Sequence, residues 1–230
     1  CSFYPAHHIT MGEGGAVFTN NSDLITIAES FRDWGRDCYC DPGCDNTCEK
    51  RFEQKLGSLP LGYDHKYTYS HSGYNLKITD MQAAIWLAQL EKLEKFIQIR
   101  TENAQFWNKK LDKYSAYLQL PKELPNSRHA YFGYSILIKN DAPFSYKQFG
   151  GFLESKNIEV RPIMAGNIVE QPSSQLYEYK ISNNLTNSTY IMKNGLFLPN
   201  HHMIGTLERQ YITDTIIEFI EKRVWENSWF

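Results

Sequence analysis

The spacing of apolar residues predicts two helices in the first half of the chain. The first helix runs from Ser22, which can cap its start, to about Trp34. The second begins at Thr79, where Gln82 completes a capping box, and its helical pattern continues across a break to about Tyr114. Its apolar stripe consists of Ala83, Ile85, Trp86, Leu87, Leu90, Leu93, Phe96 and Ile97. We expect this long helical segment to bridge two lobes.

The stretches on either side of the first helix are irregular. Residues 12–18, GEGGAVF, predict a glycine turn that enters a short apolar strand. Residues 36–62 are rich in Cys, Gly, Asp and Pro, and a loop of this length inside a compact domain is usually functional or disordered. Residues 63–75 are aromatic and polar without a clear period.

Strands and helices alternate in the second half of the chain. The pattern predicts a buried strand over 130–138, a helix over 145–155, a strand over 158–163, a loop-rich stretch over 166–205 with a short strand near 195–198, and a last amphipathic helix over 206–224. This order predicts a small α/β lobe. We therefore divide the chain into a first domain over 1–95, which contains the cysteine-rich loop, and a second domain over 96–230.

Composition narrows the class of protein. The chain has 230 residues, of which 42% are hydrophobic and 22% are charged, as in an ordinary globular protein. Its net charge of −2 gives no basic footprint for nucleic acid. A run of about 18 apolar residues is absent, and the N-terminal sequence lacks the basic and apolar regions of a signal peptide. We therefore expect a cytoplasmic protein that binds neither nucleic acid nor membranes.

Four of the five cysteines fall within eleven residues, at Cys38, Cys40, Cys44 and Cys48. A disulfide scaffold would spread its cysteines along the chain, so this cluster favours metal or iron–sulfur ligation. From the spacing alone, a zinc site that uses all four thiols and an iron–sulfur site are equally good interpretations. A loop of reactive thiols without metal also remains open, and Cys1 is a further potential donor.

Two other stretches carry candidate chemistry. Residues 2–19, SFYPAHHITMGEGGAVFT, place His7 and His8 before the glycine turn, and residues 73–84, GYNLKITDMQAA, lead into the second helix. Taken alone, the histidines are loop residues and Asn75 is a turn residue. Together, however, the two stretches resemble the DegT/DnrJ/EryC/StrS family of nucleotide-sugar aminotransferases.

The resemblance implies the α/β architecture of fold-type-I, aspartate-aminotransferase-like enzymes, which use pyridoxal phosphate (PLP). It implies that the chain is the C-terminal part of such an enzyme, that the N-terminal half of the large domain is missing, and that the fragment alone neither binds the cofactor well nor turns over. The full-length enzyme would be a homodimer in which Asn75 reaches the cofactor phosphate of the partner subunit.

His7 occupies the position at which the family pattern has a lysine. A lysine amine binds PLP covalently and completes transamination. Imidazole cannot form that link, but it can transfer protons near neutral pH. The resemblance therefore implies that pyridoxamine phosphate (PMP) binds noncovalently at His7, with His7 as the catalytic base.

Within the family, the spacing Cys38-x-Cys40-x₇-Cys48 resembles the histidine-type group of CDP-4-keto-6-deoxyglucose 3-dehydrases, which carry a [2Fe–2S] cluster. The group's fourth ligand lies upstream of this chain, and Cys44 is a potential substitute. The implied activity is PMP-dependent, iron–sulfur-containing 3-dehydration of a nucleotide-linked 4-keto-6-deoxyhexose, in 3,6-dideoxysugar and lipopolysaccharide O-antigen biosynthesis. An NAD(P)H-dependent flavin/iron–sulfur reductase would supply single electrons.

Two loops keep an alternative open. Residues 161–167, RPIMAGN, and 199–202, PNHH, resemble substrate-recognition loops of related enzymes, which makes Arg161 and His201 candidate substrate contacts. The alternative is an iron–sulfur-free GDP-4-keto-6-deoxymannose 3-dehydratase or a sugar aminotransferase relative. A second alternative, of a different class, is a noncatalytic zinc-binding module.

Overall fold

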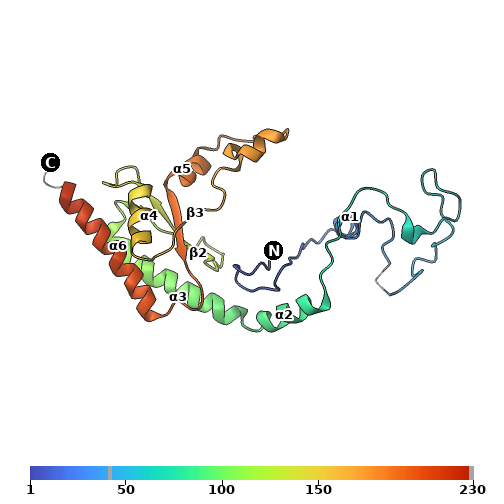
Figure 1. Ribbon diagram of the computed structural model, residues 1–230, viewed down its shortest axis with the longest axis horizontal. Helices are drawn as coiled ribbons and strands as arrows, with labels where there is room; N and C mark the ends of the chain where they lie inside the picture. The colour runs from blue at the N-terminus through green and yellow to red at the C-terminus, as the bar shows by residue number, and fades with distance from the viewer. Residues whose placement is uncertain (41–42, 228–230) are drawn as a thin grey trace. The chain divides into compact units, whose positions relative to one another are not determined.

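The computed structural model describes residues 1–40 and 43–227 and divides into two compact units, Cys1–Glu91 and Lys92–Phe230. The helices are α1 (Ser22–Arg32), α2 (Asp80–Leu90), α3 (Leu93–Leu111), α4 (Tyr146–Ser155), α5 (Thr186–Asn194) and α6 (Thr206–Asn227), and the strands are β1 (Leu118–Gln119), β2 (Gly133–Ile138), β3 (Arg161–Pro162) and β4 (Gly195–Pro199) (Figure 1). We call the two parts unit 1 and unit 2.

The first predicted helix is present as α1, but its cap differs from the prediction. Asn21, not Ser22, is the N-cap, because its side-chain oxygen accepts hydrogen bonds from the backbone of Asp23 and Leu24 at 2.9 and 3.3 Å. An amide cap of this kind satisfies two of the N–H groups that a helix start leaves unpaired. The helix ends at Arg32.

Trp34 and Gly35 turn the chain away from α1. Trp34 has φ 64° and Gly35 has φ 81°, in the left-handed region that follows many helices. A side chain at Gly35 would place its Cβ 1.9 Å from the carbonyl oxygen of His71, so only glycine fits this close approach. This turn leads directly into the loop over 36–62. That loop contains no helix or strand in its described residues, and its residues 41–42 lie outside the description.

The predicted strand in residues 12–18 is wrong. An isolated bridge pairs Ser2 with Gly15, and no ladder forms there among the described residues. Val17 and Phe18 are 84% and 75% exposed. The apolar pattern suggested a strand, but a strand also needs a neighbour that accepts and donates its backbone hydrogen bonds, and the described chain provides none beyond Ala16.

The capping box at the start of α2 is confirmed. The Thr79 N–H donates to Gln82 Oε1 at 2.8 Å, and the Gln82 N–H donates to Thr79 Oγ1 at 3.3 Å. The expected break in the long helical segment is also present, between Leu90 and Leu93, and the division between the units falls there, at Glu91.

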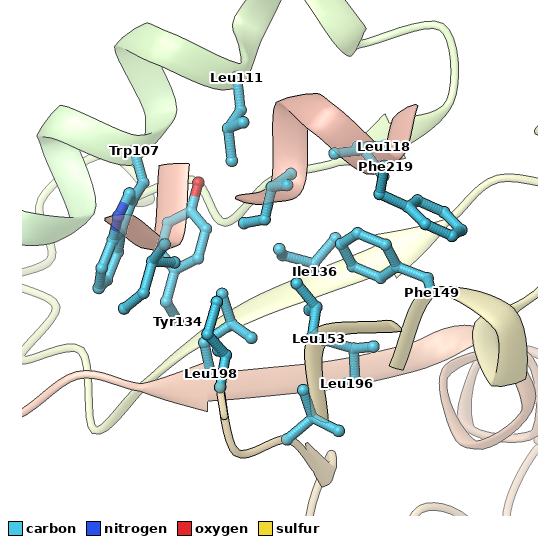
Figure 2. Packing of buried hydrophobic residues seen from close by; sticks show 14 of the residues in the cluster. Trp107, Leu111, Leu118, Tyr134, Ile136, Phe149, Leu153, Leu196, Leu198 and Phe219 are labelled. Carbon is cyan, nitrogen blue, oxygen red and sulfur yellow. The ribbon is translucent and has the colours of Figure 1, made fainter. Parts of the chain in front are cut away.

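Unit 2 contains a four-stranded sheet in the order β1-β2-β4-β3, with every pair antiparallel. Tyr134 lies opposite Leu198, and Ile136 lies opposite Leu196. These residues face a core that α3, α4 and α6 cover (Figure 2). Its fully buried side chains include Trp107, Leu111, Leu118, Tyr134, Ile136, Phe149, Leu153, Leu196, Leu198, Ile216 and Ile220.

The element predictions for unit 2 hold with three corrections. The predicted strands over 130–138 and 158–163 shorten to β2 and to the two residues of β3. The sequence pattern missed β1, and it missed α5 inside the loop-rich stretch. Helix α5 is polar apart from the consecutive residues Tyr190, Ile191 and Met192, so its sequence shows no helical apolar period. Among the described residues, none of the helices combines the length and apolar character that crossing a membrane requires.

Candidate functional site

The segment that carries His7 folds back on itself at the start of unit 1. The Phe3 N–H donates to Gly14 O at 2.9 Å, and the Met11 N–H donates to Phe3 O at 3.0 Å. His7 lies between these contacts, where its N–H donates to Tyr4 O at 2.9 Å and the two rings meet edge to face at 6.0 Å. The histidine is therefore held in a closed turn rather than in an open loop.

The ring of His7 has a defined orientation. Its Nδ1 lies 3.3 Å from the carbonyl oxygen of Ser2, which can only accept a hydrogen bond. In the tautomer that donates from Nδ1 to this oxygen, Nε2 carries the lone pair that can accept a proton.

The glycine turn after His7 is built by close packing. Met11 is buried, and a Cβ on Gly14, which has φ 154°, would lie 2.1 Å from the Met11 sulfur. Gln82 of α2 donates to Glu13 O at 2.8 Å, which ties the turn to the helix start. The close packing at Gly14 thus leaves no room for a side chain there.

Asn75, the predicted phosphate ligand, is exposed in unit 1. It forms an isolated backbone bridge with Asp33, and its neighbours are fixed on α1, where the Tyr74 N–H donates to Phe31 O at 2.7 Å. The resemblance gives Asn75 a role in the partner subunit, so that role stays a prediction.

Cys38, Cys40 and Cys48 line one pocket of unit 1, which we call the cysteine pocket. The other residues that line it are Asp33, Arg36, Asp45, Asn46, Arg51, His65, Lys66 and Lys77. Cys44 is exposed and is not among them. The structure therefore gathers the three thiols of the predicted C-x-C-x₇-C pattern and leaves the extra cysteine outside.

The thiols of the cysteine pocket differ in acidity. Hydrogen bonds from the Thr47 hydroxyl and the Cys48 backbone lower the pKa of Cys40 to about 7, whereas burial raises the pKa of Cys38. A substantial part of Cys40 is therefore thiolate at neutral pH, and the thiolate is the form that binds a metal. The three thiols match an iron–sulfur ligand set in kind. In the described parts of the chain, however, no three donors are already arranged to hold a metal ion.

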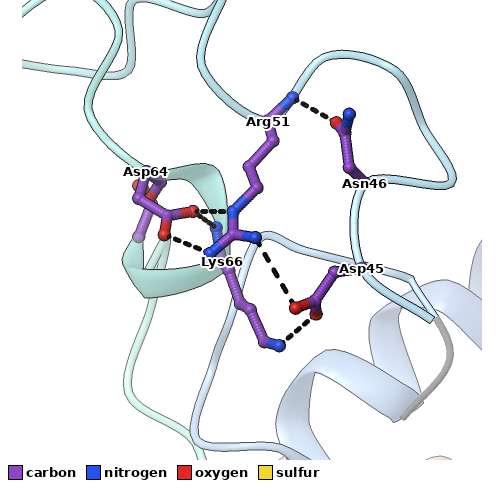
Figure 3. A network of polar contacts seen from close by, with 6 residues as sticks. Asp45, Asn46, Arg51, Asp64 and Lys66 are labelled. Atoms are coloured by element: carbon purple, nitrogen blue, oxygen red, sulfur yellow. Dashed lines mark hydrogen bonds and ion pairs between the residues drawn. The ribbon is translucent and has the colours of Figure 1, made fainter. Parts of the chain in front are cut away.

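An ion-pair network spans the cysteine pocket and fixes its loop (Figure 3). Arg51 donates to both carboxylate oxygens of Asp64 at 2.9 and 2.8 Å, and it lies 3.6 Å from Asp45. Lys66 also pairs with Asp45, and Asn46 Oδ1 accepts from the Arg51 N–H at 3.2 Å. The Arg51 guanidinium lowers the pKa of the Asp64 carboxyl, so the pair stays charged at neutral pH.

The buried side chain of His65 makes two further polar contacts in this part of unit 1. Its Nε2 lies 3.4 Å from Asp37 Oδ2, and its Nδ1 accepts from Gln54 at 3.3 Å. Sequence reasoning missed His65, Arg51 and their partners, because irregular chain gives no period from which to infer contacts. The opposite charges in this cysteine-rich region were an available signal.

The two predicted substrate contacts lie in unit 2. Arg161 is exposed and pairs with Glu159, and it also donates to Val160 O at 3.1 Å. His201 is exposed, and its Nδ1 accepts from the Met203 N–H at 3.1 Å. Burial, more than the charge of a nearby arginine, lowers the pKa of His201. For both residues, contact with the substrate stays a prediction.

Solved structures share the fold of this chain. Escherichia coli GDP-4-keto-6-deoxy-D-mannose-3-dehydratase, solved with bound hydrated PLP, aligns with a TM-score of 0.76 at 30% identity, over 94% of this chain and 53% of that chain. The fold is therefore that of the PLP-dependent, aminotransferase-like enzymes, as the sequence predicted.

The family follows from the sequence comparison. The model of the DegT/DnrJ/EryC1/StrS aminotransferase family matches residues 1–217, and the chain belongs to this family. It is 49% identical to the lipopolysaccharide biosynthesis protein RfbH of Salmonella typhimurium, over 95% of this chain and 50% of that protein. It is 46% identical to dTDP-4-dehydro-2,6-dideoxy-D-glucose 3-dehydratase of Saccharopolyspora spinosa, over 96% of this chain and 48% of that protein. The chain spans about half the length of these curated relatives.

Proposed function

We propose that the full-length protein carrying this chain is a PMP-dependent dehydratase that removes the C3 hydroxyl from a nucleotide-linked 4-keto-6-deoxyhexose. The observation that carries the proposal is His7, which stands in the family's lysine position with its Nδ1 directed at the Ser2 carbonyl. The 46% identity to a nucleotide-sugar 3-dehydratase supports the same reaction class. The product would enter 3,6-dideoxysugar and lipopolysaccharide O-antigen biosynthesis.

PMP, when bound, supplies an electron sink that makes its C4′ proton acidic and lets the sugar lose its C3 hydroxyl. The role of His7 is to accept that proton at Nε2. Its turn holds the ring by backbone contacts, so the base does not have to be ordered at each turnover. Because imidazole cannot hold the cofactor covalently, other groups must bind its phosphate, and Asn75 of the partner subunit in a homodimer would be one of them.

The proposed activity includes a redox step at the cysteine pocket. Cys38, Cys40 and Cys48 would hold a [2Fe–2S] cluster, supported by their common pocket and by the low pKa of Cys40. A cluster of this type takes four ligands, so one more donor is required, and the loop must tighten around the iron. An NAD(P)H-dependent flavin/iron–sulfur reductase would deliver the electrons.

The test of the base is a pair of adjacent histidine substitutions in the full-length protein. His7→Gln should lower the dehydration rate by about 10²–10⁴-fold, since a positioned general base contributes that factor. His8→Gln, one residue away, should leave the rate within a few-fold of wild type. Full activity of His7→Gln would show that His7 is not the base.

The test of the cluster is iron and sulfide content together with the visible spectrum after anaerobic purification. The wild type should hold two irons per chain, as a [2Fe–2S] cluster requires. Cys38→Ala should lose the absorption band, whereas Cys44→Ala should keep it, because Cys44 lies outside the cysteine pocket.

A second candidate function is favoured by one comparison. The chain is 31% identical to GDP-4-keto-6-deoxy-D-mannose 3-dehydratase of Escherichia coli over 94% of its length. An iron-free wild type that is still active on a GDP-linked sugar, without a reductase, would replace the redox-coupled proposal with this one. Stoichiometric zinc without bound B6 would instead favour a noncatalytic zinc-binding module.

A further inference from the structure

We propose that Arg100 is a positioning residue for the nucleotide-sugar substrate. It holds the loop over 199–202 so that the Nε2–H of His201 donates a hydrogen bond to an oxygen atom of that substrate. This inference rests on the proposed function and deepens it, because it names the atom of the loop that contacts the substrate and the residue that fixes it. All the residues involved belong to unit 2.

The buried side chain of Arg100, on α3, joins two loops where β2 begins and β4 ends. Its Nη1 donates to Phe132 O at 2.9 Å, before β2, and to Asn200 O, after β4. Asn200 is also buried, and its Nδ2 donates to Arg100 O at 3.0 Å and to Tyr131 O at 3.3 Å. The backbone of the loop over 199–202 is therefore fixed at Asn200, directly before His201.

The surroundings of Arg100 are costly for a purely structural residue. No carboxylate of a described residue pairs with its guanidinium, and burial lowers its pKa. Its Nε is buried without a hydrogen-bond partner in the described chain. Tyr131, whose carbonyl oxygen lies 3.5 Å from Nη1, has φ 45°, a strained conformation for an aromatic residue. A buried cation without a carboxylate beside a strained residue is more typical of a functional site than of a scaffold.

The ring of His201 is held in one hydrogen-bonding state. Its Nδ1 accepts from the Met203 N–H at 3.1 Å, and a backbone N–H can only donate. In the tautomer that accepts this bond, Nε2 carries the proton and is a donor. Burial, and after it the charge of Arg100, lowers the pKa of His201, which favours this neutral form at pH 7. The ring is exposed, so the donor is accessible to a ligand.

His202, the next residue, is packed instead of presented. Its ring stacks on Phe96 of α3, with centroids 3.8 Å apart and an interplanar angle of 11°. Burial and then the charges of Arg100, His201 and Lys92 lower its pKa as well. The two rings meet edge to face at 6.3 Å, so His202 forms a neutral wall beside His201. The loop therefore offers His201 as its exposed imidazole.

A neutral N–H donor fits the oxygen atoms of a nucleotide sugar. Hydroxyl and phosphate oxygens both accept hydrogen bonds, and this substrate class carries both. Because Arg100 and Met203 fix the donor before the substrate arrives, ordering it costs little at binding. We therefore expect the contact to strengthen substrate binding, with little effect on the chemical step.

The experiment measures steady-state kinetics of the full-length protein on whichever of the CDP-, dTDP- and GDP-linked 4-keto-6-deoxyhexoses it dehydrates. His201→Leu should raise KM by about 3–10-fold, the range that one hydrogen bond contributes, with kcat within about twofold. His201→Gln, whose amide can replace the Nε2–H, should raise KM less. Inhibition by the matching nucleoside diphosphate locates the acceptor: weaker inhibition of His201→Leu places it in the nucleotide, and unchanged inhibition places it in the sugar.

The role of Arg100 is tested with two substitutions. Arg100→Met should raise KM by the same factor, and it should raise the pKa of His201, followed by NMR, because the nearby positive charge is lost. Arg100→Lys should restore that pKa and raise KM less. In Arg100→Met/His201→Leu the effects should not add, since Arg100 acts through His201. Arg128→Met, which breaks a surface pair with Glu94 on the same helix, is the control and should keep the wild-type KM.

The outcomes separate this inference from the function on which it rests. A protein that dehydrates none of the three sugars overturns both. An active enzyme in which His201→Leu keeps the wild-type KM overturns only this inference, and additive effects of the two substitutions overturn the role of Arg100. If Arg100→Met does not fold, Arg100→Lys decides. A raised KM supports the inference, because the shorter side chain cannot keep both loops in contact, and an unchanged KM overturns it.

Discussion

The two units of this chain are stabilised in different ways. Unit 2 has a closed hydrophobic core between its sheet and three helices, with large side chains such as Trp107 and Phe149 fully buried. In unit 1 the described buried apolar side chains are Ile9 and Met11, and α1 has none. Unit 1 is organised instead by backbone turns and by the ion pairs of the cysteine pocket.

In this chain, the packed core and the candidate catalytic groups lie in different units. A core of apolar side chains gives unit 2 a stable scaffold, since burial supplies most of the favourable free energy of folding. The candidate catalytic and redox groups lie in unit 1, on irregular chain held by directional polar contacts. Such contacts place donors accurately but contribute little stability where they are exposed. The substitutions below test the contrast, from the largest expected effect to the smallest.

The largest effect should come from the core of unit 2. Trp107→Ala removes a fully buried side chain that packs on Tyr134 with ring centroids 4.9 Å apart. We expect it to lower the free energy of unfolding by about 3–5 kcal/mol, measured by urea denaturation. Phe18→Ala in unit 1 is the control, because the side chain is 75% exposed, and it should have an effect within about 0.5 kcal/mol. Equal effects would mean that Phe18 is covered in solution.

The next effect should be local to the cysteine pocket. Arg51→Gln removes the forked contact to Asp64 and the pair with Asp45, so the loop should loosen. We expect faster proteolysis of residues 36–62 and reduced iron loading, with unfolding of unit 2 unchanged. Arg161→Gln, which breaks a surface pair in unit 2, should change neither readout. A loop that resists protease as well as wild type does would contradict the role of the network.

A smaller effect concerns the acidity of one thiol in the metal-free protein. Thr47→Val keeps the shape of the side chain and removes the hydroxyl that is the main cause of the low pKa of Cys40. We expect the pKa to rise from about 7 toward the usual thiol range, so alkylation of Cys40 at pH 7 should slow several-fold.

The sign of the pH dependence follows from the same pKa. Because the folded form of Cys40 ionises more readily than the unfolded form, its contribution to stability is present above the unfolded thiol's pKa of about 8.5 and declines as the pH falls through about 7. Thr47→Val should flatten this part of the curve of stability against pH. A wild-type alkylation profile in the variant would show that the hydroxyl is not the cause.

The smallest effect should come from the start of α1. Asn21→Ala removes the cap that accepts from Asp23 and Leu24, at a cost of about 1 kcal/mol to the local helix. Hydrogen exchange in α1 should rise by about fivefold, while exchange in unit 2 stays constant. Ser22→Ala should change hydrogen exchange in α1 little. A larger increase in Ser22→Ala than in Asn21→Ala would show that Ser22 is the cap.

The sequence by itself determined the regular elements whose hydrophobic period was strong. The capping box at Thr79, the break after Leu90 and the core face of α6 were all predictable, because each depends on residues a few positions apart. The family was predictable as well, from the residues around His7 and Asn75. Helix α5 and the strand pairing of β1 were not, because the apolar residues of α5 are three consecutive positions and a two-residue strand has no period.

Only the tertiary structure decided how the chemical groups meet. The resemblance named Cys38, Cys40 and Cys48 as ligands, with Cys44 as a potential substitute. In the fold the first three line one pocket, and Cys44 is not among its lining residues. These are contacts in irregular chain, many of them between distant residues, and their geometry follows from turns and ion pairs that leave no periodic trace in the sequence.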